Sequence, residues 1–239
     1  MKLTRVTITG ADDKVDPEAL SGLSTMYPFV EWGILFSESR EGQERYPSFE
    51  WRERLERVWE QNPAMKLSAH LCGSLARRTL MGNEGWIRSA SSCPYMRVQL
   101  NGFGRSGYDG LRKLALTHES RQWILQAVDS DTLERAYALY RLDGPLFAIL
   151  HDASGGTGTA PRSWPVPLPM QHVAYAGGIT LENLEETVAT LSRLQSLEPA
   201  EDPKTFGVDL ETGARTDDQF DLRKAALILS KASYLGAGQ

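Results

Sequence analysis

The feature that most constrains the fold is a regular alternation of strand-like and helix-like segments along the whole chain. Short runs of β-branched, aromatic and aliphatic residues predict strands, and the amphipathic or capped segments between them predict helices. Eight strands are expected, at Leu3–Thr9, Phe29–Phe36, Lys66–Cys72, Arg97–Asn101, Gln122–Val128, Leu146–Asp152, His172–Ala176 and Phe206–Leu210.

Apolar periodicity and capping residues mark the helices. Pro47–Gln61 is the strongest of them, because its apolar residues fall on one face. Ser74, Asp131 and Thr180 are the expected N-caps of three others. The remaining expected helices are Pro17–Met26, Tyr108–Leu116 and Phe220–Tyr234.

Eight alternations within 239 residues match the count and size of a (β/α)8 barrel, also called a TIM barrel. A doubly wound open sheet uses the same alternation, but the repeat number and the lack of an early Gly-x-Gly-x-x-Gly motif favour the barrel. We therefore expect residues 1–239 to form a single α/β barrel domain. The irregular stretch 83–95 predicts an insertion after the third strand.

Charge and cysteine content exclude several classes of protein. The net charge is -5 and no basic block is present, which disfavours nucleic-acid binding. The two cysteines, Cys72 and Cys93, argue against a disulfide framework and fit a reducing compartment. No apolar window approaches the length of a membrane span. We expect a cytoplasmic protein without membrane or nucleic-acid partners.

Strand alternation also predicts which side chains point into the barrel. Apolar positions suit the helix-covered outer face, which leaves an unusually polar interior that includes Glu31, His70, Arg97 and Asp209. Buried charges are costly unless they are paired with each other or with a ligand. One interpretation is a self-paired network, such as Arg97 with Glu31 or Asp209. The other is a ligand site at the strand ends, formed by Thr9, Cys72, Asn101, Asp152 and Glu211.

Glycines follow three of the expected strand ends, in residues 155–158, 177–178 and 207–213. Glycine lets backbone N–H groups converge on an anion, so these turns predict one shared mouth. The alternative is three ordinary turns between strand and helix, where glycine is common.

Several short motifs occur in one order over nearly the whole chain. Together they resemble the phosphoribosylanthranilate isomerase family, although each motif alone is weak. The motifs are Arg5–Gly10, Gly33–Phe36 with Ser39-Arg40, Val98–Gly102, Leu150–Asp152 with Gly155–Gly158, Ala176–Asn183, and Gly207–Asp209 with Gly213.

This resemblance implies an Amadori rearrangement of a phosphorylated ribosyl amine, without a cofactor or metal. Asp152 would be the general acid that protonates the furanose ring oxygen. Arg40 would contact the anthranilate carboxylate. The backbone amides around Gly156, Gly178 and Gly213 would hold the phosphate.

Three positions depart from the family pattern. Thr9 stands where the family has its general-base cysteine, and a hydroxyl is a poor base without a partner. Cys72 is a neighbouring thiol that would replace it if its pKa were lowered, although a buried cysteine is more often a small apolar residue. Glu211 replaces a phosphate-binding serine, and a carboxylate about 4 Å from a phosphate costs about 1 kcal/mol or more. Asn101 replaces a histidine.

Two hypotheses follow for the function. The first is an isomerase-like enzyme that acts on a phosphorylated or sugar-bearing small molecule, with Asp152, Thr9 and Cys72 as candidate catalytic residues. The second is a barrel that has lost catalysis and binds a nucleotide, a sugar or a protein partner. The expected substrate-binding residues are Arg40, Gly156, Gly178, Gly213, Asn101, His70, Glu31, Asp209 and Glu211.

Overall fold

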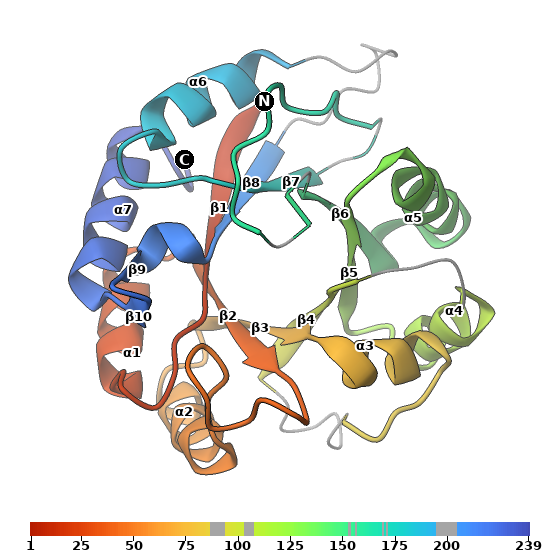
Figure 1. The fold of residues 1–239 in the computed structure, drawn as a ribbon, viewed down its shortest axis with the longest axis horizontal. Coiled ribbons are helices and arrows are strands. Elements are labelled where there is room, and N and C mark those ends of the chain that lie inside the picture. The colour runs from red at the N-terminus through yellow and green to blue at the C-terminus, as the bar shows by residue number, and fades with distance from the viewer. Residues whose placement is uncertain are drawn as a thin grey trace.

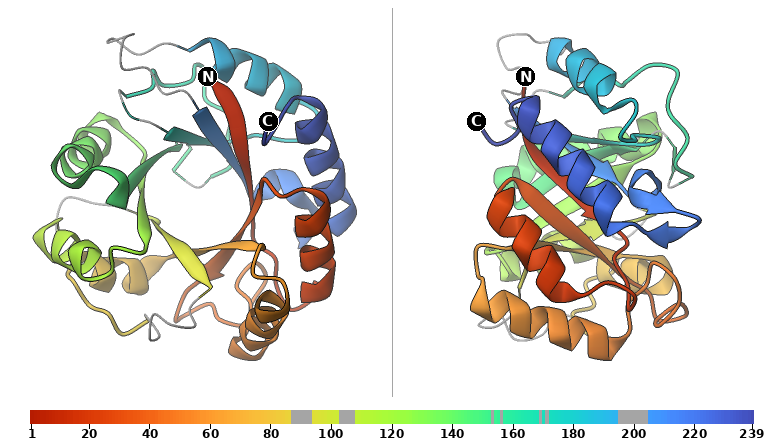
Figure 2. Two further views of the ribbon diagram at one scale, coloured as in Figure 1. Left: turned by 180° about the vertical axis from the view of Figure 1, so that it is seen from behind. Right: turned by 90° about the vertical axis from the view of Figure 1, so that its left-hand side faces the viewer.

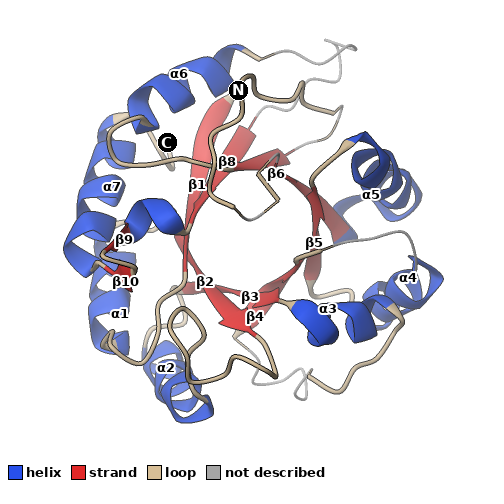
Figure 3. Cartoon of the chain, viewed as in Figure 1, coloured by secondary structure: helices blue, strands red, loops and turns tan. Residues whose placement is uncertain are grey.

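The computed structural model describes residues 1–86, 94–102, 108–152, 154–155, 157–168, 170, 172–194 and 205–239. Eight parallel strands close into a barrel in sequence order, which confirms the expected (β/α)8 fold (Figures 1 and 3). The strands are β1 (Lys2–Thr9), β2 (Val30–Phe36), β3 (Lys66–Leu71), β4 (Tyr95–Leu100), β5 (Gln122–Ala127), β6 (Phe147–Asp152), β7 (His172–Ala176) and β8 (Thr205–Leu210).

The helices form a layer outside the strands, seen end-on in Figure 3 and from the side in Figure 2. They are α1 (Pro17–Met26), α2 (Phe49–Gln61), α3 (Gly73–Leu80), α4 (Tyr108–Thr117), α5 (Ser130–Asp143), α6 (Leu184–Arg193) and α7 (Leu222–Tyr234). Two short 3-10 turns, η2 (Gly144–Leu146) and η4 (Thr212–Ala214), and a small hairpin of β9 (Arg215–Thr216) and β10 (Gln219–Phe220) complete the described elements. Among the described residues, no helix is both long and apolar enough to cross a membrane.

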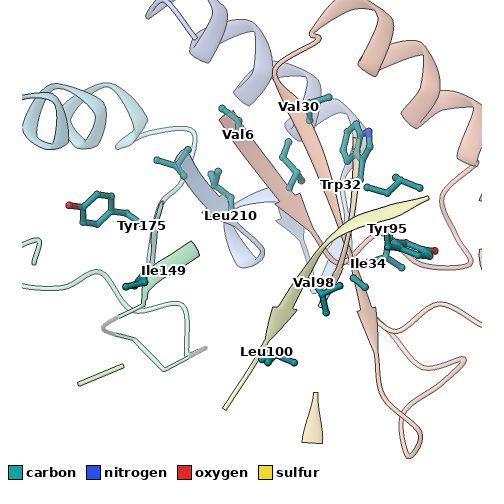
Figure 4. Close-up of a cluster of buried hydrophobic side chains, with 14 of the residues drawn as sticks. Val6, Val30, Trp32, Ile34, Tyr95, Val98, Leu100, Ile149, Tyr175 and Leu210 are labelled. Atoms are coloured by element: carbon teal, nitrogen blue, oxygen red, sulfur yellow. The ribbon is translucent and has the colours of Figure 1, made fainter. Parts of the chain in front are cut away.

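The main hydrophobic core lies between the barrel and the helices. Val6, Trp32, Ile34 and Val98 are buried outward-facing strand residues, as the alternation predicted (Figure 4). Their neighbours in sequence point into the barrel, because successive strand side chains face opposite sides. The sequence pattern therefore identified the two faces of these strands.

The barrel interior is divided into an apolar part and a polar part. Ile124, Ala148 and Leu150 form a separate buried apolar cluster, with Ala174 and Ala176 packed against it. This cluster lies on the inner faces of β5, β6 and β7. The inner faces of β1 to β4 and of β8 carry the polar residues instead. The interior is thus less polar than the sequence pattern suggested.

A buried ion pair forms the deeper end of the polar part. Arg97 Nη1 donates to Glu31 Oε1 at 2.6 Å, and Thr7 Oγ1 donates to the same oxygen at 3.1 Å. Burial alone would raise the pKa of Glu31, but the guanidinium groups of Arg97 and Arg5 outweigh it and lower the pKa to about 2. The expected pairing of Arg97 with Glu31 is confirmed. The Glu31 carboxylate is therefore paired inside the barrel, below the mouth.

Three N-cap predictions were wrong by a few residues. Asp129 and Thr132 form the capping box of α5, so Asp131 lies inside the first turn. Ser74 likewise lies inside α3, because Cys72 occupies its N-cap position. The helix α6 begins after Asn183, and Thr180 only accepts a hydrogen bond from the Asn183 backbone N–H at 3.4 Å. Of the three observed N-cap residues, Asp129 caps with its side chain, whereas Cys72 and Asn183 make no side-chain cap hydrogen bond.

The expected insertion lies between α3 and β4, and residues 87–93 of it are outside the described part of the chain. Trp86 packs edge-on against Trp123 and beside Phe36. Tyr95 is the first residue of β4 and belongs to the outer hydrophobic core. Neither aromatic residue lines the mouth of the barrel.

We expect Glu31→Gln to lower the free energy of unfolding by about 3 kcal/mol, because it leaves the buried Arg97 charge without its counterion. Urea denaturation measures this. Because the pKa of Glu31 is depressed in the fold, the difference from wild type should shrink as the pH falls from about 4.5 toward 2.

The matched control is Glu44→Gln, which breaks the exposed pair with Lys14. It should cost less than about 1 kcal/mol, since water screens that pair. Equal losses for the two variants would show that the buried pair is not a stability determinant.

Candidate functional site

A cavity of about 100 Å³ opens at the carboxyl ends of the barrel strands, where active sites of this fold lie. It is lined mainly by polar side chains and by the glycine turns after β7 and β8. The described lining residues are Thr9, His70, Gln99, Asn101, Gln126, Leu150, Asp152, Ser154, Gly158, Ala176, Gly177, Gly178, Ile179, Thr180, Asp209, Leu210, Glu211, Thr212 and Gly213.

The structure gathers most of the residues that the sequence singled out, but not all. Eight of them line the cavity: Thr9, His70, Asn101, Asp152, Gly178, Asp209, Glu211 and Gly213. Glu31, Arg40 and Cys72 do not line it. Gly156 lies outside the described residues.

Thr9 and His70 approach each other closely because the residue between them, Gly33, has no side chain. Gly33 lies between them on β2, and a Cβ atom there would clash with Thr9 Oγ1 and with the His70 ring. Its backbone has no positive φ, so close approach and not backbone geometry accounts for glycine here. Gly33 therefore makes room for two polar side chains in one layer of the barrel.

The Thr9 hydroxyl has a carboxylate partner. Thr9 Oγ1 donates to Asp209 Oδ1 at 2.8 Å, across the contact between β1 and β8. Burial raises the pKa of Asp209 to about 7, against the lowering effect of the Thr9 hydrogen bond. The nearby carboxylates Glu211, Glu31 and Asp152 raise it further. Asp209 can therefore hold or release a proton near neutral pH.

Asp152 is held by hydrogen bonds to both of its carboxyl oxygens. The Gly102 backbone N–H donates to Gln126 Oε1 at 2.8 Å, which turns the amide NH2 of Gln126 toward Asp152. Gln126 Nε2 then donates to Asp152 Oδ2 at 2.7 Å. Asp152 Oδ1 accepts from the Ser154 N–H at 3.1 Å and from Ser154 Oγ at 2.6 Å. These donors fix the orientation of the carboxyl group at the cavity.

His70 and Cys72 are poorly placed for acid–base chemistry. Burial lowers the pKa of His70 to about 4, so its ring is neutral at physiological pH. Its Nε2 lies 3.0 Å from Ser68 Oγ. Burial raises the pKa of the Cys72 thiol, and Asn101 Nδ2 lies 3.3 Å from its sulfur. A raised pKa makes Cys72 a weak substitute for the thiolate that Thr9 replaces.

Arg40 lies on the exposed loop between β2 and α2. Its Nη1 donates to Tyr46 Oη at 3.4 Å, and its guanidinium lies 5.5 Å from the centre of the Tyr46 ring. This arginine is held at the rim by an aromatic neighbour and does not reach the cavity lining in the structure.

Glu211 lines the cavity and is also paired at its edge. Its Oε1 accepts from Arg45 Nη1 at 2.6 Å, while Asp218 binds the other end of the same guanidinium. Arg45 was missed in the sequence, because 166 positions separate it from Glu211 and no local pattern links them. Pairing with a loop arginine is one way in which a carboxylate is tolerated at this position.

The glycines of the β7 and β8 turns allow chain segments to pack closely. A Cβ atom on Gly178 would clash with the backbone of Ala160, from the β6–β7 connection. A Cβ atom on Gly213 would clash with the carbonyl oxygen of Ile179. Gly178 also has a φ of +61°, which favours glycine. Close packing thus accounts for these glycines without a bound anion.

Within the described residues, no group of three His, Cys, Asp or Glu side chains is arranged to hold a metal ion. Asp152 and Asp209 are each occupied by hydrogen bonds to neutral groups. The cavity thus brings together two carboxyl groups that differ in their hydrogen-bond partners.

Comparisons with known proteins support the fold. No protein-family model and no curated protein matches the sequence. The structure is similar to N-(5'-phosphoribosyl)anthranilate isomerase from Pyrococcus furiosus, with 15% identity, a TM-score of 0.53 and coverage of 97% of this chain and 99% of that chain. It is also similar to phospho-2-dehydro-3-deoxyheptonate aldolase from Thermotoga maritima, with 12% identity, a TM-score of 0.50 and coverage of 99% and 70%. At these identities the similarity shows a TIM-barrel fold and no more.

We expect Asp209→Asn to flatten the pH dependence of stability between about pH 4 and pH 7. The raised pKa means that the folded wild type binds a proton that the unfolded chain has already lost in this range. Wild-type stability therefore falls as the pH rises, by about 2 kcal/mol for a group that still faces a cavity. Urea denaturation at several pH values gives the difference between the two proteins. Parallel curves would contradict a raised pKa at Asp209.

Proposed function

We propose that this chain is an enzyme that catalyses proton transfer on a small sugar-bearing molecule, in an isomerisation of the Amadori type. The observation that carries the proposal is the pair of carboxyl groups, Asp152 and Asp209, that line one cavity in different environments. Asp152 accepts hydrogen bonds at both oxygens, whereas burial raises the pKa of Asp209 to about 7. Groups whose environments separate their pKa values are typical of an acid and its partner base.

The two groups suit the two proton movements of this reaction. Protonated Asp209 donates to the ring oxygen of a glycosylamine, the C1–O bond breaks, and the nitrogen lone pair forms an iminium. The Asp152 carboxylate then removes the proton from C2 and an enaminol forms. When Asp152 returns its proton to C1 and the C2 hydroxyl gives its proton to Asp209, the product is a 1-amino-1-deoxyketose. Both carboxyl groups are then in their starting states.

This assignment makes Asp152 the base and so differs from the role that the family resemblance implied for it. The resemblance implied that Asp152 is the acid and that the base lies at the position of Thr9. The raised pKa of Asp209 makes that residue the proton donor near neutral pH, which leaves Asp152 as the base. Thr9 contributes by orienting Asp209 through the 2.8 Å hydrogen bond and is therefore a positioning residue.

The similarity to the isomerase from Pyrococcus furiosus supports the same reaction class, since that protein is named for isomerising a phosphoribosyl anthranilate. The second candidate function is ligand binding without catalysis. The replacement of the family's cysteine by Thr9 favours it, because the position then has no thiol to act as a base.

We expect Asp152→Asn and Asp209→Asn each to lower kcat/KM by at least about 100-fold on an N-ribosyl anthranilate, tested with and without its 5'-phosphate. The change in anthranilate fluorescence on rearrangement measures turnover. Asp16→Asn is the matched control, because Asp16 is an exposed N-cap of α1 and asparagine also caps helices.

Turnover that survives in both carboxyl variants would exclude the proposed mechanism. Binding of a reduced product analogue by wild type, with no turnover of either ribosyl amine, would favour the second candidate. Thermal unfolding of all variants shows whether a loss of activity reflects a loss of fold.

A further inference from the structure

The cavity at the mouth carries an excess of negative charge. Asp152, Asp209 and Glu211 all line it. Among the described lining residues there is no lysine or arginine, and His70 is neutral because burial lowers its pKa to about 4. A phosphate brings nearly two negative charges and requires cations or converging N–H donors to replace its hydration. The described part of the lining offers no cation.

Two arginines beside the mouth, Arg45 and Arg215, are engaged elsewhere. Arg45 is shared between Glu211 and Asp218, so these three side chains together carry a net negative charge. Arg215 is nearly fully buried, with 2% of its side chain exposed. Its Nη1 donates to the Gly10 carbonyl at 2.8 Å, and its Nε donates to the Asp218 carbonyl at 3.0 Å. Neither guanidinium is free to turn toward a phosphate.

The glycine turns to which the family resemblance assigned a phosphate pack closely against other segments of this chain. The connection between β6 and β7 lies against both turns, with Ala160 against Gly178 and Gly158 against the Thr212 side chain. Ile179 packs against Gly213. The remaining cavity of about 100 Å³ is small compared with the roughly 300–1,000 Å³ of pockets for drug-sized ligands. Its size suits a single sugar ring or a smaller polyol.

The uncharged polar side chains of the cavity lining are of the types that form hydrogen bonds with sugar hydroxyl groups. Hydroxyl and amide side chains both donate and accept hydrogen bonds, as sugar hydroxyls do. Asn101 and Gln126 are held in place by bonds to neighbouring groups, from Gln99 Nε2 at 3.0 Å and from the Gly102 N–H at 2.8 Å. The other neutral polar lining residues are Thr9, Gln99, Ser154, Thr180 and Thr212.

We propose that this cavity takes an unphosphorylated polyol or sugar, neutral or bearing an amine, and that Glu211 is the residue that excludes a phosphorylated ligand. The inference rests on the proposed function, because both place the ligand in this cavity. It does not depend on which reaction occurs there. An amine is accepted because carboxyl groups line the cavity, whereas a phosphate meets Glu211 with no cation in the described lining.

The test is a calorimetric titration of the full-length protein with two probes that differ by one group. The probes are 1,4-dideoxy-1,4-imino-D-ribitol, a cationic ring polyol, and its 5-phosphate. We expect wild type to bind the unphosphorylated probe at least tenfold more tightly. Glu211→Gln should reduce that preference at least tenfold, because it removes the charge and keeps an oxygen that accepts from Arg45.

Asp218→Asn is the matched control. Asp218 shares Arg45 with Glu211 but does not line the cavity, so its loss should change the preference less than threefold. Circular dichroism of each variant verifies that the fold is kept.

Tighter binding of the phosphorylated probe by wild type, or an unchanged preference in Glu211→Gln, would overturn the inference. Absence of binding by both probes at millimolar concentration would also overturn it. These outcomes differ from failure of the proposed function, which is seen as turnover that does not depend on Asp152 and Asp209. An enzyme that isomerises only the phosphorylated ribosyl amine would keep the proposed function and refute the inference.

Discussion

Closure of the sheet between β1 and β8 is the contact on which the candidate site depends. The two strands pair in parallel, with Thr7 opposite Asp209 and Ile8 opposite Leu210. This register brings Thr9 within 2.8 Å of a carboxylate that lies 200 positions later in the chain. An open sheet with the same strands would leave Thr9 and Asp209 at opposite edges. Barrel closure therefore creates the local environment that raises the pKa of Asp209.

The polar interior is divided between two tasks. At the deeper end, Glu31 and Arg97 neutralise each other, and the apolar cluster around Leu150 fills the opposite wall. The Glu31–Arg97 pair satisfies both charges within that layer, and the candidate site lies above it at the mouth. The cost of the floor is desolvation, which a 2.6 Å ion pair and a threonine hydroxyl offset. The ion pair that contributes to stability and the residues of the candidate site thus lie in different layers of the barrel.

Much of the fold was predictable, because strand alternation and the repeat of strand and helix are local properties of a sequence. The same period of two separated inward from outward residues on β2, where Glu31 and Trp32 face opposite sides. Contacts between distant loops were not predictable. The pairing of Arg45 with Glu211 depends on how two connections meet above the barrel. The hydrogen bond from Gln126 to Asp152 depends on a single backbone N–H, from Gly102, that orients the Gln126 amide.

Residue identity alone does not distinguish the environments of Asp152 and Asp209. They are the same side chain on neighbouring parts of one rim, and the family resemblance assigns an acid–base role to Asp152 by position alone. Their chemistry differs because one accepts from an amide and a backbone N–H, while the other accepts one hydroxyl and lies near three more carboxylates. Like charges in a confined space favour the protonated form of the group with fewest donors. Glu211 strengthens that effect, because its charge raises the pKa of Asp209 from the same cavity.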